Sequence, residues 1–320
     1  MLSTTLRALI TLALCAATSW SQAEKLHCVT TIPDLADFVR EIGGDEVTVE
    51  SLATGAEDLH NVPVRPTFLV RLQRADVFFQ LGLDAEEAWV PALLEQCRNP
   101  RIQPGKPGFV NGAWKITPLE VPDSLNRSLG NLHPRGNPHF NIDPLRGRQL
   151  VINVATGLIR VRPEKEDYFK QRFAAYSAKL KAKIDEWSEL AKPLKGKELI
   201  TFHRDLSYLA ERYEFVVVGT VEPRVGIPPT GPHVARLIEL MKERQVKVVA
   251  AGHYYAARMP GSIAEETGCK VVTTSLYVNG VPEASSYIAM VDYNLKTLLR
   301  AFDLPTELPP KEAAPKKDGE

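Results

Sequence analysis

The stretch RPEKEDYFKQRFAAYSAKLKAKIDEWSELAK, Arg162 to Lys192, decides how the rest of the chain is organised. Pro163 suits the first position of a helix, where its missing N–H has no intrahelical partner anyway, and the acidic residues after it favour the positive end of the helix dipole. Apolar residues then recur at steps of three and four, which is one face of a helix. They are Phe169, Phe173, Tyr176, Leu180, Ile184, Trp187 and Ala191.

Pro193 and Gly196 end this helix. About 30 residues at ~1.5 Å each give a rod of roughly 45 Å, which is longer than one small domain. On both sides of the rod, short strand patterns alternate with helical ones, as in parallel α/β units. The sequence therefore predicts two α/β lobes, each with a parallel sheet flanked by helices, joined by one long connecting helix. A long helix inside a single domain is the alternative.

The first residues have the pattern of a secretory signal peptide. Arg7 supplies a positive charge, an apolar run extends from Ala8 to Thr18, and the small-x-small site Ser21-Gln22-Ala23 predicts cleavage after Ala23. A lipoprotein anchor would use Cys15, but Leu14 stands where a small residue is expected. The expected location is therefore the periplasm.

The predicted organisation follows from these two features. It is a signal peptide over 1–23, an N-terminal lobe over 24–161, the connecting helix over 162–193, a C-terminal lobe over 194–305 and a disordered tail over 306–320. The tail is rich in proline and charged residues, so it has too little apolar surface to bury and is expected to be disordered.

Charge and cysteine content exclude some functions. The chain has 39 basic and 39 acidic residues, so no basic face for nucleic acid is expected. Removal of the signal peptide leaves Cys28, Cys97 and Cys269, which allow at most one disulfide and leave one thiol free. These cysteines have no CxxC spacing, which disfavours a thiolate zinc site.

A proline-rich stretch from residue 98 to residue 143 interrupts the alternation of strand and helix patterns. Long loops of this kind are usually functional or disordered. This one ends in NLHPRGNPHFNIDP, Asn131 to Pro144, which is too specific in composition for a linker. Whether the part from Arg98 to Gly130 contacts a periplasmic metallochaperone stays open.

Three histidines stand where a ligand is expected. His60 lies in a polar loop after the second strand, His139 in the proline-braced loop, and His203 just after the end of a strand of the other lobe. Ligands of open parallel sheets bind at the carboxyl ends of the strands, so a cleft between two sheets would bring these loops together. Three neutral imidazoles suit Zn²⁺. Taken singly, each histidine could equally be structural, because no HExxH-type spacing ties them together.

The chain resembles the periplasmic metal-binding proteins of bacterial zinc and manganese ABC importers, of the cluster A-I type. The resemblance covers about residues 26 to 303 and rests on three motifs. The first motif ends at His60 and reads TTIPDLADFVREIGGDEVTVESLATGAEDLH. The second contains His139 and reads GNPHFNIDP, and the third contains His203 and reads ITFHRDLSYLAERY. The resemblance implies that these three histidines are metal ligands and that the helix from Pro163 joins the two lobes rigidly.

The chain departs from the family at the fourth ligand. The family often has an Asp in a context like T-D-S-L, where this chain reads Thr273-Thr274-Ser275-Leu276, and a Glu where this chain has Gly252. With a flavodoxin-like strand order, His253 would lie near His203 and could complete a four-histidine site. Water or Glu222 remains open as the fourth ligand, and His133 is expected to brace its loop. The His-rich acidic loop of zinc-specific members is absent too.

The leading hypothesis is a non-enzymatic monomer that captures Zn²⁺ between its lobes and delivers it to a membrane permease. Imidazole ligands favour zinc, whereas manganese prefers oxygen ligands and is the alternative cargo. A zinc hydrolase is a further alternative, because three histidines with an open position could activate water. No clear general base accompanies the motifs, although Asp205 follows His203 by two residues. A surface protein stabilised by a structural metal also stays open.

Overall fold

The structure is a computed structural model that describes residues 24–123, 133–223 and 226–309. The predicted signal peptide over 1–23 and the last residues of the predicted tail, 310–320, lie outside these ranges. Within the described residues, no helix combines the length and the apolar composition that crossing a bilayer requires.

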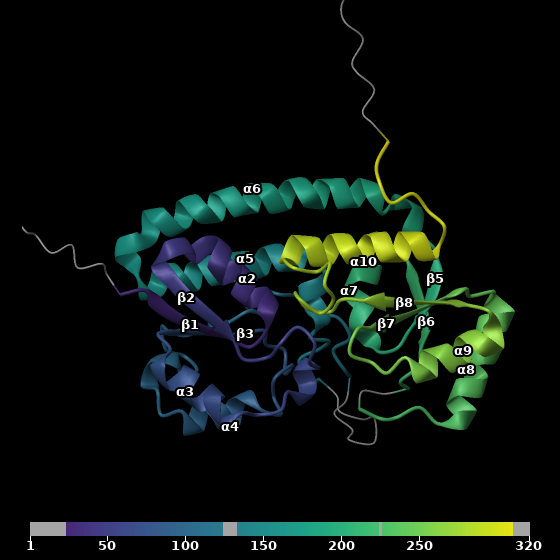
Figure 1. Ribbon diagram of the computed structural model, residues 1–320, viewed down its shortest axis with the longest axis horizontal. Helices are drawn as coiled ribbons and strands as arrows, with labels where there is room; N and C mark the ends of the chain where they lie inside the picture. The colour runs from purple at the N-terminus through teal and green to yellow at the C-terminus, as the bar shows by residue number, and fades with distance from the viewer. Residues whose placement is uncertain (1–23, 124–132, 224–225, 310–320) are drawn as a thin grey trace, which may run out of the picture.

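The N-terminal lobe contains a parallel sheet of four strands in the order β2-β1-β3-β4. The strands are β1 (Leu26–Thr30), β2 (Val47–Ser51), β3 (Val77–Gln80) and β4 (Phe109–Asn111). The helices are α2 (Pro33–Gly43), α3 (Pro66–Arg74), α4 (Val90–Gln96) and α5 (Pro144–Val161). Figure 1 shows α2 and α5 on one side of this sheet and α3 and α4 on the other.

The C-terminal lobe repeats the plan with the strand order β6-β5-β7-β8, again all parallel. Its strands are β5 (Glu198–Thr201), β6 (Val216–Thr220), β7 (Val248–Gly252) and β8 (Lys270–Thr274). Its helices are α7 (Ser207–Tyr213), α8 (Gly231–Arg244), α9 (Arg258–Thr267) and α10 (Tyr287–Ala301). The predicted α/β class and the predicted neighbourhood of β5 and β7 are therefore confirmed.

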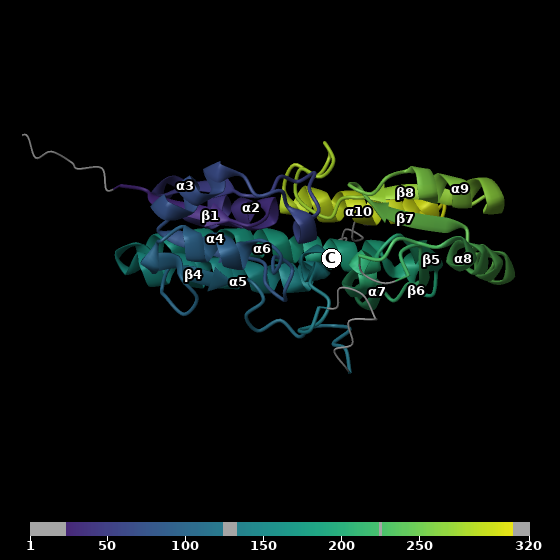
Figure 2. The same cartoon turned by 90° about the horizontal axis from the view of Figure 1, so that it is seen from below.

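The connecting helix is α6 (Glu166–Leu190), preceded by a 3₁₀ turn over Pro163–Lys165. Its 25 residues correspond to roughly 38 Å, somewhat less than the predicted rod. Figure 1 shows α6 running above both lobes, and Figure 2 shows the two lobes side by side along the same axis. The exact lobe boundaries of 24–161 and 194–305 stay predictions.

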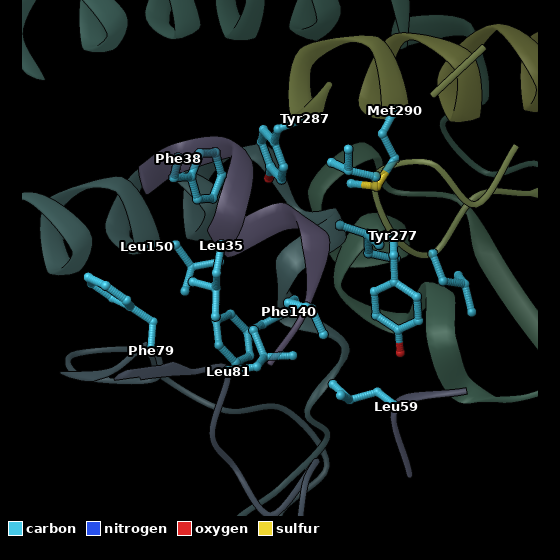
Figure 3. Close-up of a cluster of buried hydrophobic side chains, with 14 of the residues drawn as sticks. Leu35, Phe38, Leu59, Phe79, Leu81, Phe140, Leu150, Tyr277, Tyr287 and Met290 are labelled. Atoms are coloured by element: carbon cyan, nitrogen blue, oxygen red, sulfur yellow. The ribbon is translucent and has the colours of Figure 1, made fainter. Parts of the chain in front are cut away.

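One apolar core continues from lobe to lobe. The ring of Phe38 on α2 lies 4.6 Å from the ring of Tyr287 on α10 and 6.0 Å from the ring of Tyr176 on α6, measured between ring centroids. Figure 3 shows Phe38 of the first lobe beside Tyr287 of the second. Because these side chains are fully buried, separating the lobes would expose them to water. The fold therefore opposes a large hinge motion.

The structure corrects two local predictions. The residue pattern from Glu86 to Cys97 predicts a single helix, but α4 begins only at Val90. The Glu86 carboxylate instead accepts hydrogen bonds from the backbone N–H groups of Leu81 and Gly82, which holds this segment in turns. The proline-rich stretch contains the short strand β4, which pairs with β3. Three residues between glycine and proline turns carry too little periodicity to be recognised.

The three cysteines among the described residues are unpaired. Cys28, Cys97 and Cys269 are buried free thiols, so the one disulfide that the sequence allows does not form among the described residues.

Candidate metal centre

His60 lies in a 3₁₀ turn, Leu59–Asn61, in the loop that follows β2. The Asp58 carboxylate caps this turn by accepting a hydrogen bond from the backbone N–H of His60 at 3.0 Å. The ring Nδ1 of His60 lies 3.3 Å from the carbonyl oxygen of Ala85, to which it can donate. The other ring nitrogen, Nε2, is then left with a free lone pair.

His139 opens the 3₁₀ turn His139–Ile142, which leads into α5. Its backbone N–H donates to the side-chain oxygen of Asn137 at 2.9 Å, and the Asn137 amide donates to the carbonyl oxygen of Arg204 at 2.7 Å. Asn137 therefore fixes the His139 turn against the segment that follows His203. In the sequence, the sign of this contact is an Asn two residues before the histidine, a residue type common in turns.

His203 follows β5 directly, at the carboxyl end of the second sheet. Its Nδ1 forms a hydrogen bond with the carboxylate of Glu222, which follows the neighbouring strand β6. The remaining Glu222 oxygen accepts a hydrogen bond from the backbone N–H of Gly226 at 2.7 Å. Adjacent parallel strands thus supply a histidine and the carboxylate that orients it.

The structure brings these three histidines together. Each of them offers a ring nitrogen that lies within 4.8 Å of the nitrogens offered by the other two. The Nε2 atoms of His60 and His139 are 3.2 Å apart. Two nitrogens bound to one tetrahedral Zn²⁺ at ~2.0–2.1 Å lie about 3.3 Å apart, so this pair already has the spacing of two ligands of one ion.

Burial lowers the pKa of two of the three rings, and a carboxylate raises that of the third. Burial, together with the nearby His60 and His203, holds the pKa of His139 well below its ordinary value, so this ring is neutral. Burial also lowers the pKa of His60. At His203 burial acts in the same direction, but the hydrogen bond to Glu222 outweighs it and raises the pKa. Neutral imidazoles are the form that binds metal ions.

A cavity of about 590 Å³ leads to the cluster, and both His60 and His203 line it. The carboxylates of Asp58, Asp84, Glu87 and Glu222 line the same cavity, and among the residues that the structure describes Arg135 is the one Arg or Lys in the lining. A cleft with walls of one sign concentrates ions of the opposite sign. The cavity is therefore suited to a cation rather than to an anion.

His133 lies at this cavity, with its ring stacked on that of His60 at 4.7 Å between centroids. Burial lowers its pKa to about 3. It is not one of the histidines that the structure gathers into the three-residue group.

The structure does not bring His253 to this group. Its Nε2 lies 2.5 Å from the carbonyl oxygen of Gly55, and its Nδ1 accepts a hydrogen bond from the backbone N–H of Leu276. The predicted order of the strands is right, but the ring turns towards the opposite lobe. The prediction of a four-histidine site therefore needs correcting in this arrangement, because both ring nitrogens of His253 already have backbone partners.

The two positions that depart from the family pattern hold no carboxylate, and a side chain at Gly252 would collide with Leu276. A Cβ atom at Gly252 would lie 2.6 Å from a methyl carbon of Leu276. Thr274 is fully buried and directs its hydroxyl towards the carbonyl oxygen of Ala251 at 3.4 Å. Among the described residues, Glu222 is the acidic side chain that forms a hydrogen bond with the ring of one of the three histidines.

Asp205 does not face solvent. Its carboxyl group is fully buried, and burial raises its pKa to about 7, against the opposing effect of His203. It is therefore poorly placed to act as an exposed general base.

Comparison with known proteins agrees with this geometry. The zinc-binding lipoprotein AdcA of Streptococcus pneumoniae serotype 4 is 25% identical over 309 residues, which cover 94% of this chain and 61% of AdcA. The chain thus spans about three fifths of the length of that relative. The manganese ABC transporter substrate-binding lipoprotein PsaA of Streptococcus pneumoniae is 23% identical over 295 residues, 89% of this chain and 91% of PsaA.

A crystal structure of ZnuA has the same fold, with a TM-score of 0.74 at 23% identity over 87% of this chain and 99% of that one. The family described as "Zinc-uptake complex component A periplasmic" matches residues 28–301, which include both sheets except the first two residues of β1, the connecting helix and all three clustered histidines. The chain therefore belongs to the ZnuA family of zinc-uptake components.

Proposed function

We propose that this protein captures Zn²⁺ in the periplasm and delivers it to the permease of an ABC importer. The observation that carries this proposal is the spacing of 3.2 Å between the Nε2 atoms of His60 and His139, with His203 beside them. A free ion would enter through the acidic cavity and meet three imidazoles that three different loops hold in place. Membership of the zinc-uptake family supports the same cargo.

His60, His139 and His203 are the proposed ligands. The ring of His203 is held at Nδ1 by Glu222, which leaves its Nε2 for the ion. Metal-binding histidines usually have such an outer carboxylate, which fixes the tautomer and raises the basicity of the ligand nitrogen. Water completes the tetrahedron in this proposal. The open position gives a receiving protein a place from which to take the ion.

Transport without catalysis is the proposed activity. A zinc hydrolase needs a free carboxylate beside the bound water. Both oxygens of Glu222 already have partners, His203 and the Gly226 N–H, and Asp205 is buried. The chain is proposed to act as a monomer, and the signal peptide predicted over 1–23 would export it. Contact with a metallochaperone is not needed for this function.

Manganese is the second candidate cargo, and the observation that favours it is the acidic cavity. Four carboxylates line this cavity, and Mn²⁺ prefers oxygen ligands. The three clustered imidazoles, of which His60 and His203 line the cavity, favour Zn²⁺ instead.

Calorimetric titration of the metal-stripped protein with Zn²⁺, and separately with Mn²⁺, tests the proposal. One tight zinc site and weak manganese binding are expected. His139→Ala should abolish tight binding, because it removes a central ligand. His27→Ala removes a histidine near the start of the inner strand β1, where its ring contacts Thr48, and should bind zinc as the wild type does. Failure of the wild type to bind either metal stoichiometrically would refute the proposal.

A further inference from the structure

His253 joins the two lobes through its ring. It follows β7 in the C-terminal lobe, yet its Nε2 lies 2.5 Å from the carbonyl oxygen of Gly55 in the N-terminal lobe. Its Nδ1 accepts a hydrogen bond from the backbone N–H of Leu276 at 3.3 Å. A carbonyl oxygen only accepts and an amide N–H only donates, so the ring is neutral with its hydrogen on Nε2.

Two glycines allow this close approach. A Cβ atom at Gly55 would lie 2.3 Å from the carbonyl oxygen of Val278, so a side chain there would push the lobes apart. A Cβ atom at Gly280 would lie 2.5 Å from the Cε1 atom of His253. The imidazole is therefore fixed by backbone on both sides, and its hydrogen bond to Gly55 has little freedom to shift.

The loop that receives this hydrogen bond leads directly to His60. Glu57 accepts hydrogen bonds from the backbone N–H and the hydroxyl of Thr54, at 2.7 and 3.0 Å. Asp58 then caps the turn that contains His60. The four residues between Gly55 and His60 thus form a braced segment, which transmits a displacement of Gly55 to the ligand.

The same loop of the C-terminal lobe also supports the His139 turn. Asn141, two residues after His139, donates to the carbonyl oxygen of Leu276 at 2.9 Å. The fully buried Asp34 accepts from the Asn141 amide and from the backbone N–H of Val278, both at 3.0 Å. Both histidines of the N-terminal lobe are therefore anchored to one C-terminal segment, residues 276–278, with His253 as the anchor on the His60 side.

We propose that His253 is a positioning residue, which ties the His60 loop to the C-terminal lobe and so sets the distance between His60 and His203. The inference rests on the proposed zinc function and adds to it a link between lobe contact and ligand spacing. When this link is intact the three ligands are held ready for the ion. When the lobes separate slightly at the contact between His253 and Gly55, His60 moves with Gly55 and the ion is released more easily.

Three substitutions separate the roles of the ring nitrogens. The amide nitrogen of His253→Gln can replace Nε2 as the donor to Gly55. The shorter His253→Asn can replace Nδ1 as the acceptor from Leu276 but does not reach Gly55. His253→Ala removes both. The measurements are the zinc affinity by competition with a chelating dye, the Co²⁺ absorption spectrum, and hydrogen exchange of residues 53–60 in the metal-free protein.

All three variants should bind one zinc ion with an unchanged Co²⁺ spectrum. Zinc affinity should fall about tenfold in His253→Ala and His253→Asn, within the range seen when supporting residues of a metal site are removed. Exchange of residues 53–60 should accelerate in the same two variants, and His253→Gln should restore both properties. An altered Co²⁺ spectrum in His253→Gln would make His253 a ligand and overturn the inference.

Wild-type affinity and exchange in His253→Ala would overturn it as well. The metal-free exchange measurement separates this inference from the proposed function. If the wild type binds no zinc, the proposed function fails, yet the exchange of residues 53–60 still decides whether His253 anchors the loop.

Discussion

The carboxylate of Glu222 and the imidazole Nδ1 of His203 are joined by a hydrogen bond at the carboxyl ends of the adjacent strands β6 and β5. The pair is almost completely shielded from solvent, and the second Glu222 oxygen is held by the Gly226 N–H. Because this hydrogen bond occupies Nδ1 of His203, the lone pair of its Nε2 is left to bind a metal ion. Glu222 thus decides which nitrogen of His203 faces the other two histidines.

Replacing Glu222 tests this role. Glu222→Gln removes the negative charge that makes the His203 nitrogen more basic, so zinc affinity should fall by roughly 10–100-fold with one site retained. Competition with a chelating dye measures the affinity. Glu243→Gln, an exposed substitution on α8, is the matched control and should leave the affinity unchanged. Equal affinities of Glu222→Gln and wild type would show that Glu222 does not support His203.

Zinc should stabilise the folded protein, because the site joins loops that separate on unfolding. At free zinc 100-fold above the dissociation constant, the free energy of unfolding should rise by about 2.7 kcal/mol. Urea unfolding with buffered zinc, and with a chelator, measures the difference. The same experiment on His139→Ala should show no dependence on zinc. A dependence that persists in this variant would place the ion elsewhere.

Asp34 should make stability depend on pH. Burial raises its pKa to about 7, and the hydrogen bonds from Asn141 and Val278 oppose this only in part. Between pH 4 and 7 the folded state therefore keeps a proton that the unfolded state has lost. The free energy of unfolding falls over this range as pH rises, and the contribution is completely lost above pH 7.

Asp34→Asn removes this titration. Relative to wild type, the variant should gain roughly 2–3 kcal/mol in the free energy of unfolding between pH 5 and pH 8. Urea unfolding of the metal-free proteins at both pH values gives the comparison. Asp45→Asn, at an exposed position, controls for surface charge. Parallel pH curves for wild type and Asp34→Asn would contradict the assignment.

Gly147 should be irreplaceable within α5. Alanine is favoured over glycine in a helix by about 1 kcal/mol, but a Cβ atom here would lie 1.8 Å from the hydroxyl oxygen of Tyr287. That hydroxyl donates to the carbonyl oxygen of Asn141 at 2.7 Å, so it cannot move without losing a buried hydrogen bond. Gly147→Ala should therefore destabilise the protein by about 1–3 kcal/mol.

Gly261 on α9 offers the opposite case, because a Cβ atom there would meet no atom within 4 Å. Gly261→Ala should stabilise the protein by up to about 1 kcal/mol. Thermal unfolding of both variants measures the contrast. A gain in stability for Gly147→Ala would show that α10 can shift away from α5 at no cost.

The sequence by itself determined the features that depend on neighbouring residues. The spacing of Phe169, Tyr176 and Leu180 predicted the buried face of α6, because helical periodicity is local. The alternation of strands and helices predicted two parallel sheets, and the three motifs singled out His60, His139 and His203. Local signals failed for β4, which is too short to show a period, and for the start of α4, where Glu86 turns back to bond Leu81 and Gly82.

Only the tertiary structure decided what surrounds the three histidines. His253 and Gly55 are 198 residues apart in the chain, and they meet because one apolar core joins the lobes. Strand order placed His253 near His203 but could not tell which way its ring turns, since that depends on the backbone of the opposite lobe. For the same reason Glu222 could be named as a candidate from the sequence, whereas its hydrogen bond to His203 depends on how β5 and β6 pair.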